Sequence, residues 1–351
     1  MDQISQIATT IVGQMQSATL AFLIGGVLLG ALGSKLRIPD GAYQTVVLIL
    51  LLKVGLGAGI AIKEAGIVSL IVPALAAAAV GVAIVLLGAV TLARLRGVNM
   101  ADAFATVGLF GAVSASTLAA GMSVMDDGGV SYEGYIAALY PFMDLAALLT
   151  AVVLARMALA RQAAPAGGTV AIGGTVGGSV GGPKIGGVDA KGILIDTLRS
   201  TAISALLLGL LIGLLAEPGR VYEGFYEPLF RGLLSLLMLA MGLEAWSRLK
   251  ELKGVAWAYL AYGLTGPLVH GALGLGAGLI LHETVGFSAG GMALLAVMAA
   301  SSSDISGPPT MRGALPEANP SAYVGASTGL GTPVAILSIP LWIALAQALT
   351  A

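Results

Sequence analysis

Two apolar stretches of this sequence carry small polar residues whose groups can bind ions. Residues 108–117 read GLFGAVSAST, and residues 301–309 read SSSDISGPP. Serine and threonine hydroxyls both donate and accept hydrogen bonds, and the carboxylate of Asp304 offers acceptor oxygens. Neither stretch contains Lys, Arg, His or Cys. An aspartate within apolar sequence is costly and is usually functional, so the second stretch is the stronger candidate for a site.

Both stretches are predicted to interrupt a helix. Pro308 and Pro309 lack the amide hydrogens that a continuous helix needs, and the first stretch contains Gly108 and Gly111. Inside lipid, an interrupted helix is tolerated only where protein or water satisfies its backbone. The freed ends present N–H groups with a positive dipole, and carbonyls that can hold a cation. We expect the two interruptions to cross and form one polar cavity, although the small residues of the first stretch also suit close helix packing.

Four other ionisable residues fall inside apolar segments. Asp144 follows Pro141 and is a candidate cation ligand, with a structural hydrogen-bonding role as the alternative. Lys53 and Glu244 lie at corresponding depths and are expected to form a structural ion pair. His270 has no second histidine nearby in sequence, so we expect a hydrogen-bonded packing residue rather than a metal ligand.

The composition identifies a polytopic membrane protein. Of 351 residues, 57% are hydrophobic and only 10% are charged, and the mean hydropathy is +0.96. A soluble domain has about 25% charged residues, so a soluble enzyme and a disordered chain are excluded. The net charge of −1 leaves no basic excess for nucleic acid, and the absence of cysteine excludes disulfides and thiolate chemistry.

Ten apolar segments are long enough to cross a bilayer, which takes about 20 residues per helix. Because these runs are continuously apolar rather than alternating, we predict helices and not a barrel. The expected spans are 18–36, 43–62, 67–93, 101–123, 134–160, 197–216, 227–247, 255–281, 288–313 and 321–349.

The basic residues predict the orientation. With the N-terminus outside, 13 Lys and Arg fall in inner loops and 3 in outer loops, while Lys53 lies within a span. This bias is the positive-inside pattern of a multi-pass protein. The first 16 residues contain no Lys or Arg, so we expect them to be part of the mature chain and not a signal peptide.

The chain is predicted to consist of two five-helix repeats, 1–160 and 196–351, joined by a Gly-rich cytoplasmic linker, 161–195. The segment VGLGAGIAIKE from Val54 aligns without a gap with MGLEAWSRLKE from Met241. Likewise, Gly26 and Gly30 of the first span match Gly209 and Gly213 of the sixth. An odd number of helices per unit forces the second copy to be inverted, and inverted repeats are typical of secondary transporters.

At SSSDISGPPTMRGALPEANPSAYVGASTGLGTP and VYEGFYEPLFRGLLSLLMLAMGLEAWSR the sequence resembles the cyanobacterial sodium-dependent bicarbonate transporters of the SbtA type. The segments GLFGAVSASTLAA, SYEGYIAALYPFMD and SATLAFLIGG fit the same family, so the resemblance covers essentially the whole chain. The linker departs from the family, because here it is short, Gly-rich and poor in charge.

The resemblance implies a plasma-membrane symporter, not an enzyme, that imports bicarbonate with Na⁺ for inorganic carbon accumulation. It further implies ten spans in inverted repeats, a homotrimer, and an elevator-like core moving against a scaffold, or gate, domain. A PII-like trimeric regulator that binds adenine nucleotides is implied on the cytoplasmic side. Apart from co-transported Na⁺, no cofactor is expected.

The substrate region of the family corresponds here to Gly111–Thr117 and Ser301–Gly307. Bicarbonate needs N–H and hydroxyl donors, and Na⁺ needs oxygen ligands. The candidate bicarbonate-binding residues are Gly111, Ala112, Ser114, Ser116, Ser302, Ser303 and Gly307. The candidate sodium-binding residues are Phe110, Thr117, Asp144, Ser301 and Asp304.

Two alternatives remain open from the sequence. A sodium/organic-anion symporter of similar inverted-repeat fold would carry a larger anion, and short Ser and Gly side chains suit either a small or a wide pocket. An intramembrane aspartyl protease could use Asp144 and Asp304 as its dyad, but the sequence has no GxGD motif.

Overall fold

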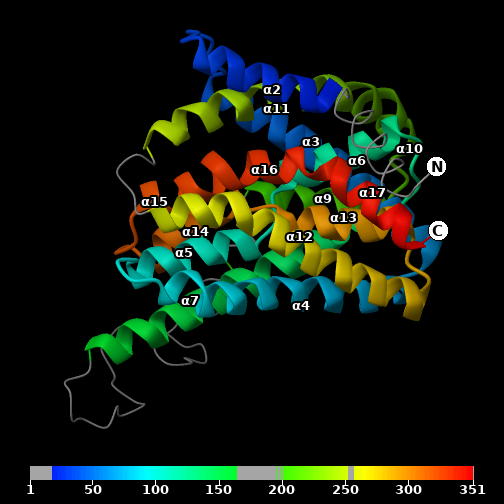
Figure 1. Ribbon diagram of the computed structural model, residues 1–351. Helices are drawn as coiled ribbons and strands as arrows, with labels where there is room; N and C mark the ends of the chain where they lie inside the picture. Colours follow the sequence, from blue (N-terminus) through cyan, green and yellow to red (C-terminus); the bar gives the residue numbers. More distant parts are fainter. Residues whose placement is uncertain (1–17, 164–194, 196–198, 200, 252–256, 351) are drawn as a thin grey trace.

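The computed structural model describes residues 18–163, 195, 199, 201–251 and 257–350. These described residues form helices and connecting loops, with no strand among them (Figure 1). Most of the predicted linker, 161–195, lies outside the described residues, as do residues 1–17. The all-helical prediction is therefore confirmed for the part of the chain that the structure describes.

Breaks divide the helices more finely than the sequence predicted. The first half contains α2 (Ala18–Ala31), α3 (Asp40–Ala65), α4 (Val68–Val90), η1 (Leu92–Arg94), α5 (Met100–Gly111), α6 (Ala115–Asp127), η2 (Ile136–Leu139) and α7 (Tyr140–Ala163). The second half contains α9 (Thr201–Leu215), α10 (Gly219–Val221), η3 (Tyr222–Tyr226), α11 (Glu227–Glu251), α12 (Trp257–Val285), α13 (Ala289–Ala300), α14 (Gly307–Ala314), α15 (Pro320–Val324), η5 (Gly325–Gly331), α16 (Thr332–Leu337) and α17 (Ile339–Thr350).

The described helices form a multi-span membrane protein. Six are long and apolar enough to cross a bilayer, and a seventh span results if Pro320–Leu337 and Ile339–Thr350, bent by 43°, are one crossing. Shorter apolar helices lie at Ala18–Ala31, Ile203–Leu215 and Ala289–Ala300, where the first, sixth and ninth spans were predicted. Each predicted span thus coincides with an apolar helix, but only six or seven of them have the length of a full crossing.

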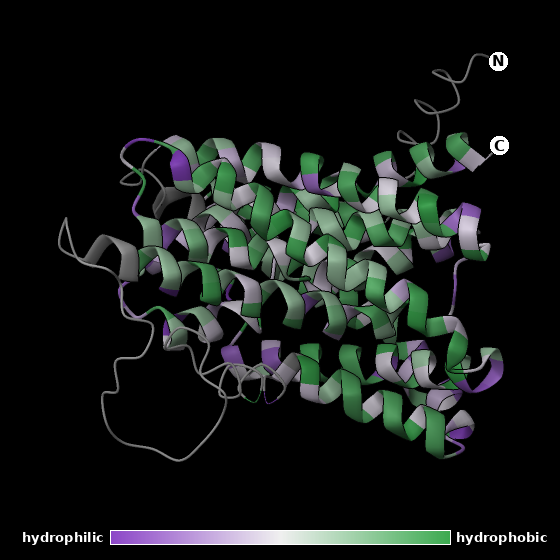
Figure 2. Cartoon of the chain, turned by 90° about the horizontal axis from the view of Figure 1, so that it is seen from below, coloured by the Kyte–Doolittle hydropathy of each residue, from purple (hydrophilic) through white to green (hydrophobic). Residues whose placement is uncertain are grey.

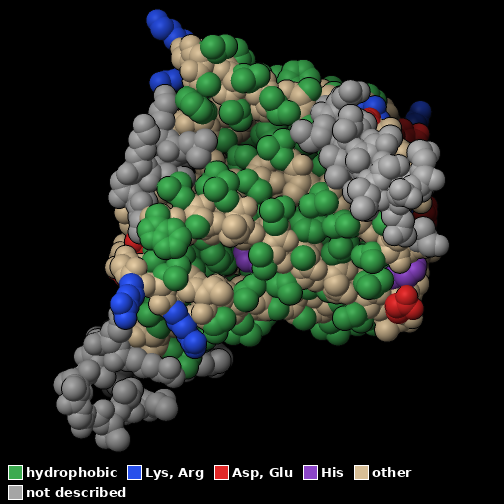
Figure 3. Space-filling model, in the orientation of Figure 1, with side chains coloured by type: hydrophobic (Ala, Val, Ile, Leu, Met, Phe, Trp, Pro, Cys, Tyr) green, Lys and Arg blue, Asp and Glu red, His purple; other side chains and the backbone are tan. Residues whose placement is uncertain are grey.

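The surface also suits a lipid environment. Apolar residues run along the length of the helices (Figure 2), and the visible face is mainly hydrophobic between its two ends (Figure 3). Large apolar side chains are strongly exposed, among them Leu32 at 83% and Leu215 at 77%. The visible Lys and Arg lie mostly at the left end of Figure 3, and the visible Asp and Glu mostly at the right end.

Glycine contacts join the helices into pairs, α2 with α11 and α3 with α9. A Cβ added to Gly26 would lie 2.9 Å from the Cα of Gly242, and one added to Gly55 would lie 3.1 Å from the Cα of Gly209. The sequence alignment matches Gly26 with Gly209 and Gly55 with Gly242. The contact of Gly26 with Gly242 therefore corresponds, in the other half, to the contact of Gly209 with Gly55. We call α2, α3, α9 and α11 the gate group, and α4 to α7 with α12 to α17 the core group.

Gly55→Ala is expected to destabilise the gate group, because its Cβ would lie 2.2 Å from the carbonyl oxygen of Leu206. Overpacking of this kind typically costs about 1–3 kcal/mol, so the unfolding temperature of the purified protein is expected to fall. Gly25→Ala is the matched control, since nothing lies within 4 Å of its added Cβ. Equal melting temperatures of the two variants would contradict the assigned packing.

Candidate functional site

The first interruption separates α5 from α6. Helix α5 ends at Gly111, Ala112 adopts an extended conformation, and Ser114 starts α6 as its N-cap. The Ser114 hydroxyl accepts hydrogen bonds from the amide of Thr117 at 3.1 Å and from its hydroxyl at 3.0 Å. A hydroxyl at the N-cap satisfies an amide that the helix itself leaves unpaired, so the sequence favours a new helix start here.

The second interruption separates α13 from α14. The Ser301 hydroxyl donates to the carbonyl of Met298 at 2.7 Å as α13 ends. Helix α14 begins at Gly307, which places Pro308 and Pro309 in its first turn, where proline is tolerated. Both predicted interruptions are therefore present.

The two interruptions meet and satisfy each other's backbone. The amide of Ser114 donates to the Ser301 hydroxyl at 2.9 Å, and the amide of Ser303 donates to the carbonyl of Leu109 at 2.8 Å. The first bond joins residues 187 positions apart in the sequence, so distant segments meet in the interior. The expected crossing of the two interruptions is observed.

Each half-helix N-terminus is matched with one aspartate. At α6, the hydroxyl of Ser116 donates to Oδ2 of Asp304 at 2.6 Å. At α14, the N-cap Ser306 donates to Oδ2 of Asp144 at 3.0 Å, while the amide of Val113 donates to Oδ1 at 3.1 Å. Asp144 is fully buried and bonds to both interruptions, whereas Asp304 is partly exposed.

Two predicted bicarbonate ligands of the second interruption, Ser302 and Ser303, already have hydrogen-bond partners within the protein. The Ser303 hydroxyl accepts from the amide of Gly307 at 2.8 Å and lies 2.9 Å from the Ser306 hydroxyl. The Ser302 hydroxyl lies 3.1 Å from that of Thr332. Since both prolines of α14 lack an amide hydrogen and the amide of Gly307 bonds to Ser303, the expectation that α14 offers free N–H groups is wrong.

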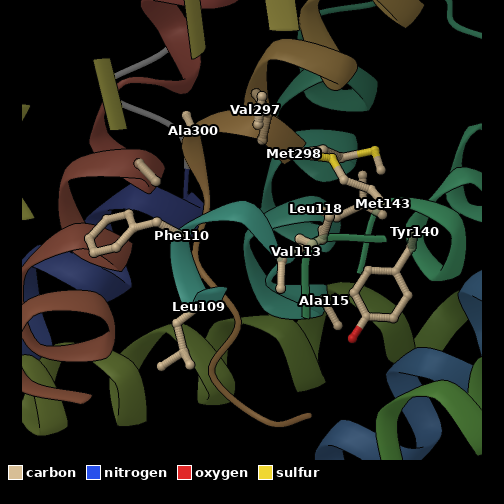
Figure 4. Close-up of a cluster of buried hydrophobic side chains, with 14 of the residues drawn as sticks. Leu109, Phe110, Val113, Ala115, Leu118, Tyr140, Met143, Val297, Met298 and Ala300 are labelled. Atoms are coloured by element: carbon tan, nitrogen blue, oxygen red, sulfur yellow. The ribbon is translucent and has the colours of Figure 1, made fainter. Parts of the chain in front are cut away.

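Glycines and apolar side chains enclose the crossing. A Cβ on Gly111 would lie 2.7 Å from Val85 Cγ2, and one on Gly307 would lie 2.8 Å from Ser303 Cβ, so both glycines permit close packing. Figure 4 shows the apolar cluster around the first interruption, whose buried members include Leu109, Phe110, Val113, Ala115, Leu118, Tyr140, Met143, Val297, Met298 and Ala300. This cluster buries Ser114, Ser301 and Ser303 completely, whereas Asp304 at the edge of the crossing keeps partial exposure.

The predicted ligand lists omit two hydroxyl groups of this network, those of Ser306 and Thr332, although Ser306 falls within the predicted region 301–307. Ser306 directly precedes the helix start at Gly307, and the preference for serine at the N-cap could have indicated it. Tyr140 also joins the network, because its hydroxyl lies 3.4 Å from that of Ser306. Thr332 follows a π-helical segment, η5, and its sequence carried no comparable signal.

Two carboxylates anchor the outer ends of the interrupted spans. Asp102, in the first turn of α5, accepts from the amide of Asn319 at 2.7 Å. Glu133 accepts at 2.6 Å from the amide of Ser288, the N-cap of α13, and at 2.9 Å from its hydroxyl. Each bond ties the beginning of an interrupted span in one half of the chain to a loop of the other half.

Lys53 and His270 have their contacts outside the crossing. Lys53 Nζ lies 4.4 Å from the ring centroid of Phe230 and 5.6 Å from that of Tyr222, which are cation–π distances. Its pairing with Glu244 stays a prediction. His270 lies 3.2 Å from the Tyr262 hydroxyl, as expected for a packing residue. No group of three or more His, Asp or Glu side chains able to hold a metal ion occurs in the described residues.

Interrupted helices that cross in the interior of a multi-span helical protein are typical of secondary transporters. The chain matches the family model of the Na⁺-dependent bicarbonate transporter superfamily over residues 18–347, and it belongs to that superfamily. It is accordingly a membrane transporter and not an enzyme, which removes the aspartyl protease alternative. A search of curated proteins gives no match.

Asp144→Ala is expected to lower the unfolding temperature in choline and in sodium buffers alike. The change leaves the Val113 amide and the Ser306 hydroxyl without their acceptor, at a cost of about 1–3 kcal/mol for each group left unpaired. Asp144→Asn keeps a hydrogen-bond partner for both groups, so its unfolding temperature is expected to fall less than that of Asp144→Ala. The measurement is thermal unfolding of the purified protein, followed by tryptophan fluorescence.

Asp127→Ala is the control for this series, because the ion pair of Asp127 with Arg231 is exposed and such pairs contribute little. A loss of stability confined to sodium buffer would show that Asp144 acts as a cation ligand alone.

Proposed function

We propose that this chain imports bicarbonate together with Na⁺, driven by the Na⁺ gradient, and thereby accumulates inorganic carbon. The observation that carries the proposal is the crossing of the two interrupted helices, where hydroxyl groups and two aspartates lie at helix N-termini. The stretches 108–117 and 301–309 that cross contain no Lys or Arg. Such a site can attract an anion only through dipoles and hydrogen bonds. A co-bound cation supplies the missing positive charge.

The N-terminus of α6 is the proposed position of the anion. The amides of Ala115 and Ser116 are in the first turn, where a helix has no internal acceptor for them. These two amides offer donors to one small planar anion. The hydroxyls of Ser114, Ser116, Ser302 and Ser303 make hydrogen bonds that would have to rearrange before they could bind it.

Asp304 is the proposed principal ligand of Na⁺. Its carboxylate is partly exposed, so a cation can reach it, and the Ser301 and Thr117 oxygens lie in the same crossing. An unpaired ion in a site of low dielectric costs several kcal/mol, so joint binding of the two ions is favoured. A tenfold Na⁺ gradient supplies about 1.4 kcal/mol per ion transported.

The proposed architecture has ten spans in two inverted repeats with the N-terminus outside and the linker in the cytoplasm. The corresponding glycine contacts of the two halves in the gate group support the repeat. So do the two carboxylate anchors, because each joins the start of an interrupted span in one half to a loop of the other. The location of most visible basic side chains at one end supports the orientation. The gate group is the proposed scaffold, against which the core group moves as an elevator.

Uptake of radiolabelled bicarbonate tests the function directly. Cells that express the chain in a host without its own transporter are expected to take up bicarbonate in sodium medium, and to fall to background when choline replaces sodium. Asp304→Asn is expected to remove this uptake while the protein still inserts in the membrane. Uptake that persists in choline would indicate a channel, and transport of a larger organic anion in place of bicarbonate would indicate the organic-anion symporter.

We also propose a homotrimer in the plasma membrane that is regulated by a PII-like trimer on its cytoplasmic side. This part of the proposal rests on the family resemblance. The purified transporter is expected to have the mass of three chains and to retain the PII-like protein to an extent that changes with AMP. A monomeric mass, or no retention with or without AMP, would contradict it.

A further inference from the structure

Three hydroxyl groups at the start of α6 form a chain of hydrogen bonds that ends on Asp304. Thr117 Oγ1 donates to Ser114 Oγ at 3.0 Å, Ser114 Oγ lies 2.8 Å from Ser116 Oγ, and Ser116 Oγ donates to Asp304 Oδ2 at 2.6 Å. The distances shorten toward the carboxylate, as expected where the last acceptor carries a charge.

The carboxylate fixes the direction of this chain. A hydroxyl has one hydrogen to donate, and an ionised carboxylate can only accept. Because the hydrogen of Ser116 goes to Asp304, the hydrogen of Ser114 goes to Ser116, and that of Thr117 goes to Ser114. All three hydroxyl hydrogens are therefore committed toward Asp304, and none is left for another anion.

The carboxylate of Asp304 also resembles the transported anion. Carboxylate and bicarbonate each carry one negative charge on a planar group of oxygens that accept hydrogen bonds. Here the Asp304 carboxylate binds next to the positive end of α6, where an anion is favoured. Asp144 differs, since it is fully buried and its two oxygens hold Val113 and Ser306 in place.

We propose that Asp304 is an internal competitor of bicarbonate: without sodium its carboxylate holds the hydroxyl chain of α6, and Na⁺ releases that chain by binding Asp304. The inference rests on the proposed function and adds an order to it, because Na⁺ must bind first. Once Na⁺ compensates the carboxylate charge, the Ser116 hydroxyl can donate to bicarbonate instead of Asp304. The hydroxyls of Ser114 and Thr117, which bond to it in sequence, are then free to reorient as well. Sodium dependence then arises from removal of a competitor as well as from charge attraction.

Binding to the purified full chain in lipid nanodiscs, measured by calorimetry, tests this role. The probes are choline bicarbonate and sodium bicarbonate at the same pH. The unmodified chain is expected to bind bicarbonate at least about tenfold more tightly with sodium, and to bind sodium without bicarbonate. Asp304→Asn is expected to bind bicarbonate with equal affinity in both salts, because the competing charge is gone.

Glu317→Gln is the matched control, since Glu317 is a partly exposed carboxylate that pairs with Arg156 outside the crossing. It is expected to keep the sodium dependence of the unmodified chain. An Asp304→Asn protein that melts normally yet binds bicarbonate in neither salt would overturn the proposal. So would tight binding of choline bicarbonate by the unmodified chain, a measurement that does not depend on any variant folding.

The binding results and the uptake results are separable. If the unmodified chain shows sodium-dependent uptake but Asp304→Asn binds no bicarbonate, the competitor role is wrong and the proposed function stands. If the unmodified chain takes up no bicarbonate in sodium medium, the proposed function itself fails.

Discussion

Backbone polar groups released by a broken helix must find partners inside the protein, because lipid offers none. In this chain the two broken helices supply partners to each other. The Ser114 amide bonds to the Ser301 hydroxyl, and the Ser303 amide bonds to the Leu109 carbonyl. Neither interruption could be satisfied in this way without the other. This mutual satisfaction fixes where α5, α6, α13 and α14 lie and thereby the position of the proposed ion site.

The charge of the proposed site follows from the same crossing. Each half-helix N-terminus has an aspartate as a hydrogen-bond partner, Asp304 at α6 and Asp144 at α14. The two stretches that cross contain no Lys or Arg to offset these carboxylates. Placing an anion beside them is unfavourable unless a cation binds as well. In the proposed function, this arrangement is the physical basis of the sodium requirement.

Different contacts hold the two groups of helices together. In the gate group, glycines allow backbones to approach closely, as Gly26 does against Gly242. In the core group, a buried apolar cluster surrounds the hydrogen bonds, and Asp102 and Glu133 anchor the outer ends. In the proposed elevator, tight backbone packing suits the scaffold, and a core with its own internal hydrogen bonds can move without losing them.

The sequence by itself determined the membrane class, the apolar helices, both interruptions and the residues gathered at them. These features depend on local properties, such as hydropathy and the missing amide hydrogens of Pro308 and Pro309. Only the tertiary structure decided how the polar groups pair. Ser116 bonds to Asp304, which lies 188 positions further along the chain, and the Ser303 hydroxyl accepts from the first amide of α14. Asp144 accepts from Val113 and Ser306, and Thr332 lies within hydrogen-bond distance of Ser302. Such pairings depend on which helices pack together and on the rotation of each one, and no local pattern encodes either.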